Sequence, residues 1–276
     1  MLDLNKIFTD STPSPDGIEP YMYELGIPSD GLLMNAILMT PAGAGPHPLV
    51  VMLHGYPGNE RNLFVAEALR MIGCSVLFFH YRGAWGSPGK FSLANVLQDA
   101  CAAVDYFKRD DIAKQYGVDR SRIFVVGQSM GGFATILTLA ARDDLKGAVA
   151  IAPYDFAAAY EFAMSDPDGM AQLRAMSENP CPQLSYVRPG IMQDELAEHS
   201  KEWLFVRQAG KLSGKELCVI GFNQDEASVP ALHFDPMAAA YKGNNFTMLR
   251  MDGDHSYSGK KMAVARAVCA WISAKA

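Results

Sequence analysis

A serine flanked by glycines is the residue of this sequence best placed to do chemistry. It lies in Gly127-Gln128-Ser129-Met130-Gly131, after the β-branched and aromatic run 123–126 and before a stretch with helical spacing, 133–142. A strand that turns into a helix within a few residues crowds the serine's neighbours, so positions without side chains are needed there. Such a nucleophile elbow lifts the hydroxyl clear of the sheet, where Ser129 can attack a substrate.

A serine nucleophile needs a base that takes its proton. Of the six histidines, His255 is the strongest candidate because it follows the predicted last strand, 246–251, among small and turn-forming residues. His54 stands before Gly55 and is expected to brace a loop.

The base in turn needs an acid that fixes its tautomer and stabilises its charged form. Asp225 comes after the predicted strand 216–221 and gives the chain order Ser, Asp, His. Glu226 and Asp155, of which the latter also follows a strand, remain alternatives.

Two backbone amides are candidates for an oxyanion hole. Met130 begins the helix after Ser129, where free N–H groups and the helix dipole favour negative charge. Tyr56 follows the predicted strand 49–53, and Gly55 and Gly58 would let its loop turn N–H groups inward.

Eight strand-like segments must position these residues. Helical spacing alternates with them from residue 49 onward, in the runs 62–72, 95–108, 133–142 and 259–272. The alternation predicts an α/β fold, a mostly parallel eight-stranded sheet flanked by helices, opened by an antiparallel hairpin. In such sheets ligands bind outside the carboxyl ends of the strands. The expected strands are 21–27, 32–39, 49–53, 75–79, 123–126, 147–152, 216–221 and 246–251.

The rhythm is interrupted once, after the sixth strand. Residues 154–214 carry short helix-like pieces, notably 156–164 and 193–208, broken by prolines and rich in methionine and aromatic residues. They are expected to form a helical lid or cap inserted into a core of residues 21–153 and 215–276, although an extra helical layer with its own small core is the simpler alternative. Residues 1–20 are expected to form an N-terminal arm.

Composition excludes several classes of protein. The 276 residues are 49% apolar and 20% charged, which suits one α/β domain with an insertion. A net charge of −6 without a Lys/Arg run argues against a nucleic-acid binder. The five cysteines are scattered and lack Cys-x-x-Cys spacing, which indicates neither a disulfide framework nor a zinc site. No signal peptide and no membrane-spanning run is visible, so a cytoplasmic protein is expected.

Cofactor and metal motifs fit poorly. The loop 83–91 is faintly like a phosphate-binding loop, but Ala84 occupies the place of its first glycine and Phe91 that of the Ser/Thr that would hold magnesium. No Gly-x-Gly-x-x-Gly follows the first parallel strand, and no histidine pair has zinc spacing. The sequence predicts neither a cofactor nor a metal.

The sequence resembles the α/β-hydrolase family over nearly the whole chain from about residue 21. The resemblance is carried by Asp225, by His255 and by two motifs, His54-Gly55-Tyr56-Pro57-Gly58 and Gly127-Gln128-Ser129-Met130-Gly131-Gly132. Within this family the sequence is similar to compact carboxylesterases, including cinnamoyl and feruloyl esterase-like members, and to the catalytic domains of prolyl-oligopeptidase-type serine peptidases. No β-propeller domain precedes the catalytic unit here, which counts against the peptidase interpretation.

The resemblance implies that Ser129 is the nucleophile, His255 the base and Asp225 the acid, with the amides of Tyr56 and Met130 as the oxyanion hole. The expected function is a serine carboxylesterase acting on a small-molecule ester. A peptidase or amidase with the same machinery and a ligand-binding member with negligible turnover are the alternatives. Acyl and alcohol specificity and the oligomeric state stay open.

Overall fold

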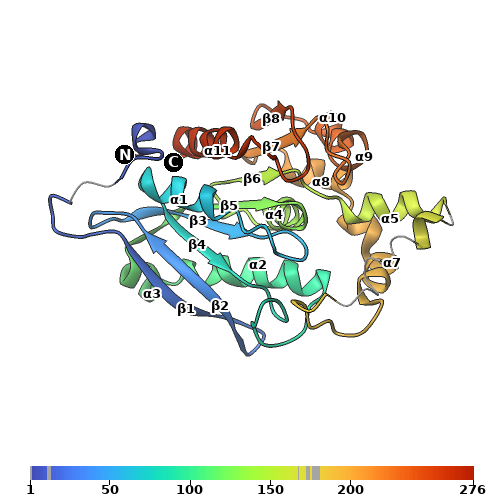
Figure 1. Ribbon diagram of the computed structural model, residues 1–276, viewed down its shortest axis with the longest axis horizontal. Helices are drawn as coiled ribbons and strands as arrows, with labels where there is room; N and C mark the ends of the chain where they lie inside the picture. The colour runs from blue at the N-terminus through green and yellow to red at the C-terminus, as the bar shows by residue number, and fades with distance from the viewer. Residues whose placement is uncertain (1, 11–13, 167, 172–174, 176–180) are drawn as a thin grey trace.

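The computed structural model describes residues 2–10, 14–166, 168–171, 175 and 181–276 (Figure 1). The expectations for residues 1 and 11–13 of the arm and for residues 167, 172–174 and 176–180 of the lid therefore lie outside the described residues.

One eight-stranded sheet organises the molecule, in the order β1-β2-β4-β3-β5-β6-β7-β8 (Figure 1). β1 pairs antiparallel with β2 and β2 antiparallel with β4, whereas all later neighbours are parallel. The predicted α/β fold with an opening hairpin is confirmed. The strands are β1 (Tyr21–Ser29), β2 (Leu32–Thr40), β3 (His47–Leu53), β4 (Ser75–Phe79), β5 (Val118–Gln128), β6 (Gly147–Ile151), β7 (Leu217–Phe222) and β8 (Phe246–Met251).

The central strands are apolar on both faces because each face has its own core. Along β3, Leu49, Val51 and Leu53 belong to one core. Val50 and Met52 point the other way into a second core, as the alternation of a strand requires. Strands buried on both faces read as continuous apolar runs, which is why they could be recognised in the sequence.

Helices cover both faces of this sheet. α1 and α11 pack together over one face, and α2 and α4 lie over the other (Figure 1). None of the helices in the described part of the chain is long and apolar enough to cross a membrane. The helices are η1 (Leu4–Lys6), α1 (Leu63–Met71), α2 (Leu93–Lys108), α3 (Asp110–Tyr116), α4 (Met130–Ala141), α5 (Phe156–Met164), α7 (Ile191–Trp203), α8 (Phe205–Leu212), α9 (Pro230–His233), α10 (Asp235–Ala240) and α11 (Lys261–Lys275).

The insertion after β6 departs from the expected pattern at one point. Residues 193–208 were expected as one helical piece, but α7 ends at Trp203 and α8 begins at Phe205. Leu204 between them is extended, with φ −59° and ψ 124°. The buried carboxylate of Asp155 accepts a hydrogen bond from the Phe205 N–H at 2.8 Å, which fixes the start of the second helix. A distant side chain therefore sets this boundary.

The arm and the insertion both contact the core. Ile7 of the arm is buried, and the Asp3 N–H donates to the carbonyl of Ile72. In the insertion, α5 packs on α7, while α8 packs on α4 and α10. α5 and α7 project from one end of the molecule (Figure 1). That the insertion acts as a lid remains a prediction.

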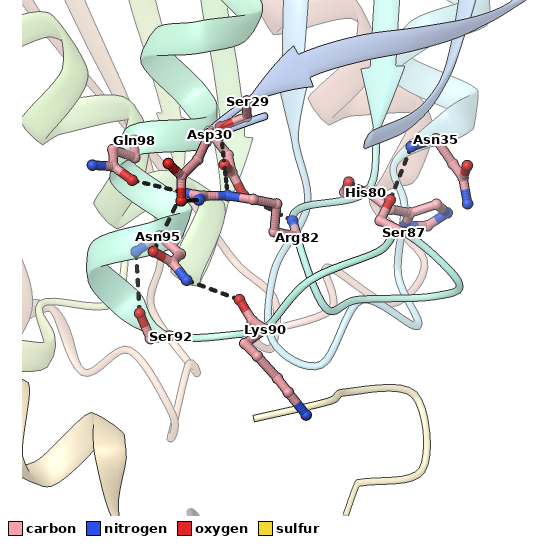
Figure 2. Close-up of polar contacts among 11 residues, drawn as sticks. Ser29, Asp30, Asn35, His80, Arg82, Ser87, Lys90, Ser92, Asn95 and Gln98 are labelled. Atoms are coloured by element: carbon pink, nitrogen blue, oxygen red, sulfur yellow. Dashed lines mark hydrogen bonds and ion pairs between the residues drawn. The ribbon is translucent and has the colours of Figure 1, made fainter. Parts of the chain in front are cut away.

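The loop after β4 is fixed by a buried ion pair. Arg82 is 3% exposed, and its Nε donates to Oδ1 of the fully buried Asp99 at 2.6 Å. The guanidinium also donates to Asp30 and to Gln98 (Figure 2). Burial raises the pKa of Asp99. Hydrogen bonds from the Ser29 hydroxyl and from the backbone N–H and guanidinium of Arg82 oppose this shift. The pair thus joins the β1–β2 turn, the loop and α2.

Arg82→Leu is expected to lower the free energy of unfolding by about 3–5 kcal/mol, because it leaves the carboxylate of Asp99 buried without its cation. Urea denaturation measures this. Arg188→Leu is the matched control, since Arg188 pairs with Asp194 while both are more than half exposed, and it should cost about 1 kcal/mol or less. Equal losses for the two variants would contradict the assignment.

Candidate active site

Ser129 sits in a strained turn between β5 and α4. Its φ of 58° and ψ of −117° are rarely adopted by a residue with a side chain. Its N–H donates to the Ile151 carbonyl at 3.0 Å, which ties the turn to β6. The serine precedes the first turn of α4 without capping it, so the hydroxyl stays available for other partners.

The elbow and the end of β3 are in direct backbone contact. A Cβ on Gly131 would lie 1.9 Å from the carbonyl oxygen of Leu53. A Cβ on Gly55 would lie 3.3 Å from Cβ of Ser129 and 2.8 Å from Oε1 of Gln128. Only glycine fits at position 131, and the close approach of Gly55 places the loop that carries Tyr56 against the elbow.

The structure brings Ser129, His255 and Asp225 together in hydrogen-bonding order. His255 Nε2 lies 3.0 Å from Ser129 Oγ, and His255 Nδ1 lies 2.8 Å from Asp225 Oδ2. An ionised carboxylate can only accept, so Nδ1 carries the proton and Nε2 is left as the acceptor for the serine hydroxyl.

Asp225 is held rigidly for this contact. It is 4% exposed, and its Oδ1 accepts from the N–H groups of Ala227 and Ser228 at 2.9 and 2.7 Å. Ser228 Oγ donates in turn to the carbonyl of Pro153. These bonds orient the second carboxylate oxygen toward His255.

The two alternative acids lie elsewhere. Glu226 is exposed. Asp155 is buried, caps α5 through the Ala157 and Ala158 N–H groups, and also accepts from Phe205. Burial raises the pKa of Asp155 to about 7, against the effect of these donors. Its contacts are those of a residue that joins two helices.

The Gly55–Tyr56 peptide is oriented by His54. Burial lowers the pKa of His54 to about 3, so the imidazole is neutral. Its Nδ1 lies 2.8 Å from the carbonyl oxygen of Gly55 and donates to it. This peptide is trans, so the N–H of Tyr56 points opposite to the carbonyl. The bond therefore turns the Tyr56 amide away from His54.

Two side chains of the site escaped the sequence analysis. The amide nitrogen of the buried Gln128 lies 3.3 Å from both Nε2 and the carbonyl oxygen of His255. The hydroxyl of Tyr186, from the insertion, lies 2.5 Å from that of Tyr56. The only sequence signal for Gln128 is its place next to Ser129. No pattern in the sequence indicates that Tyr186 lies near Tyr56.

Among the described residues, no group of three or more His, Cys, Asp or Glu side chains could hold a metal ion. The fixed charges at the site are the carboxylate of Asp225 and the positive end of α4, while His54 and His233 are kept neutral by burial, which lowers the pKa of His233 to about 4. The arrangement can move one proton and stabilise one developing anion.

Comparisons with known proteins point to hydrolases. The model of a family described as serine aminopeptidase, S33, matches residues 44–211. Esterase EstD of Thermotoga maritima is 30% identical over 155 residues, which cover 50% of this chain and 34% of that protein. The matches to other curated relatives are similarly partial, for example 37% of an uncharacterised Mycobacterium tuberculosis protein. The chain thus spans about a third to a half of the length of the curated relatives that it matches.

Solved structures share the fold over most of the chain. Est1E from Butyrivibrio proteoclasticus, in a structure with ferulic acid bound, has a TM-score of 0.64 at 21% identity, covering 91% of this chain and 98% of that one. The acylaminoacyl peptidase of Pyrococcus horikoshii has a TM-score of 0.65 at 16% identity, covering 93% of this chain but 41% of that one.

Gly131→Ala is expected to destabilise the protein by about 4 kcal/mol or more, because the new methyl group meets the Leu53 carbonyl and β3 or the elbow must move. Gly210→Ala is the matched control. Gly210 lies inside α8 with open space around its Cβ position, so alanine there should stabilise by about 0.5–1 kcal/mol. Chemical denaturation of both variants checks the pair, and a Gly131→Ala protein of unchanged stability would refute the close contact.

Proposed function

Because the chain belongs to the serine aminopeptidase S33 family of α/β hydrolases, we propose that it is a serine carboxylesterase that hydrolyses carboxylic esters through an acyl-enzyme intermediate. The observation that supports this most is the hydrogen-bond path from Asp225 through His255 to Ser129. Its order and its distances are those needed to make a serine hydroxyl nucleophilic.

In the first step Ser129 Oγ attacks the ester carbonyl while its proton passes to Nε2 of His255. Asp225 stabilises the imidazolium that results, through the bond to Nδ1. The carbonyl oxygen becomes an anion, for which the amides of Met130 and Tyr56 are the proposed donors. The start of α4 adds a favourable dipole.

In the second half of the step the tetrahedral intermediate breaks its bond to the alcohol oxygen, which takes the proton from His255 Nε2. The acyl group stays on Ser129. Water then gives a proton to His255 and attacks the acyl carbon, and the acid leaves as Ser129 recovers its hydrogen. No other group is needed to balance the reaction.

The insertion is proposed to act as a lid over the site around Ser129. Its chain leaves the site directly, since the Tyr154 N–H donates to the carbonyl of Ser129. It returns along the loop after β4, where the N–H groups of Trp85 and Phe91 donate to Gln183 and Ser185. The bond between Tyr186 and Tyr56 then ties the lid to the proposed oxyanion loop.

A peptidase or amidase with the same residues is the second candidate. It is favoured by the name of the matched family and by the likeness to acylaminoacyl peptidase. Amides have a poorer leaving group and need better protonation from His255. Rates on an ester and an amide with the same acyl group therefore distinguish the two. A ligand-binding protein with negligible turnover would fail to react with a fluorophosphonate probe at Ser129.

Ser129→Ala is expected to lower kcat for p-nitrophenyl esters on the order of 10⁶-fold, as when the serine is removed from other hydrolases of this mechanism. Circular dichroism and the thermal midpoint should be unchanged. Ser256→Ala, at an exposed serine beside His255, is the control and should keep its activity. Turnover that survives Ser129→Ala would eliminate this residue as the nucleophile.

His54→Phe is expected to lower kcat with little change in KM, because the Tyr56 amide loses the bond that orients it. The loss should approach the roughly 10²–10³-fold effect of removing one oxyanion donor. His199→Phe, at a part-exposed imidazole stacked on Trp203, is the control. A rise in KM with kcat unchanged would show that His54 shapes the substrate pocket instead.

A further inference from the structure

A cavity of about 510 Å³ lies on the α1 face of the sheet, where β2 and β4 run beside the β1 edge. Its apolar lining includes Leu25, Ile37, Leu63 and Phe78. One cation, Arg61, stands in this lining. We call this space the Arg61 cavity.

Arg61 carries a charge without a matching carboxylate. Within the ranges that the structure describes, no Asp or Glu oxygen lies within 4.0 Å of its guanidinium. The guanidinium instead lies over the ring of Trp85, 4.4 Å from the centroid. A stacked arginine keeps its planar edge free for a bidentate acceptor such as a carboxylate.

Among the described residues that line the cavity, Arg61 is the only cation, and the other polar groups are neutral or negative. Burial, helped by the nearby Arg61, lowers the pKa of His80 to about 4, so His80 is neutral. The Ser87 hydroxyl accepts from the backbone N–H of Asn35 and donates to the backbone carbonyl of His80, which fixes these two residues side by side (Figure 2). Glu24 is exposed at the rim and is the one anion.

The larger cavity near the N-terminal arm, of about 620 Å³, differs in this respect. Its two arginines pair with carboxylates, Arg70 with Glu67 and Arg122 with Asp119, and its lysine, Lys6, shares the lining with Asp3 and Asp10. An unneutralised guanidinium above an apolar floor distinguishes the Arg61 cavity.

We propose that the Arg61 cavity binds an amphipathic monocarboxylate, with its carboxylate on Arg61 and its hydrocarbon chain on the apolar lining. The protein as a whole is negative and repels anions, so recognition has to be local. The hydrocarbon explains why Leu25, Ile37 and Phe78 line a cavity next to a charge.

This site is distinct from the one around Ser129. None of Ser129, His255 and Asp225 lines the cavity, and binding there needs no reaction. Acids of this kind are also what ester hydrolysis releases, so under the proposed function the ligand would be a product or a product-like effector. The binding itself does not rest on that function.

The test is calorimetric titration of the full-length Ser129→Ala protein with octanoate and, as an uncharged match, octanamide. Octanoate should bind and octanamide should bind at least about tenfold more weakly, because only the carboxylate gains charge-assisted hydrogen bonds. Arg61→Gln should weaken octanoate about 10- to 100-fold. Glu24→Gln should tighten it about two- to fivefold, since a like charge leaves the rim.

Arg266→Gln is the matched control, because Arg266 also stacks on an aromatic ring, that of Phe8, away from the cavity. It should leave the octanoate affinity unchanged, and the thermal midpoints of all variants check the fold. The proposal is overturned if Arg61→Gln and Arg266→Gln bind octanoate alike, or if octanamide binds as well as octanoate. If the octanoate affinity does not depend on Arg61, this site is refuted. Ester hydrolysis by the wild-type protein in that case would leave the proposed function standing.

Discussion

The contact between the backbones of β3 and α4 is the constraint from which the site follows. Gly131 lies so close to the Leu53 carbonyl that no side chain fits between them. The parallel register of β3 and β5, in which Leu53 is opposite Gly127, sets this approach. Because two rigid elements meet there without intervening side chains, the strained turn at Ser129 and the loop at Gly55 have fixed relative positions. Precise geometry at the site thus comes from backbone packing.

Burial and backbone hydrogen bonds fix the neighbours of Ser129 and His255 at the site. Asp225 stays oriented through two backbone donors, and His54 is neutral because burial excludes the charged form. Arg82 and Asp99 neutralise each other beneath the loop after β4. In the proposed mechanism the proton passes between Ser129 and His255 beside a histidine, His54, that stays neutral.

The sequence predicted what local patterns determine. The eight strands and the elbow could be recognised because apolar runs and glycines mark them in the sequence. The proximity of Ser129, Asp225 and His255 follows from the rule that the carboxyl ends of parallel strands meet at one edge of the sheet. The break at Leu204, by contrast, depends on the distant Asp155. Tyr186 reaches Tyr56 only through the path of the insertion. Contacts made by the tertiary fold leave no local pattern to read.

One loop carries both Tyr56 and Arg61, and the hydrogen bonds that hold this loop determine whether a ligand at Arg61 affects the Tyr56 amide. The Trp85 indole donates to the Pro57 carbonyl at 2.8 Å, and His54 holds Gly55, so the loop is fixed between its ends. A carboxylate on Arg61 would cancel a charge that helps to keep the pKa of His54 low. Burial is the larger cause of that shift, however, and it persists. His54 then stays neutral and keeps its bond to Gly55, so the proposed oxyanion loop keeps its orientation with the cavity empty or filled.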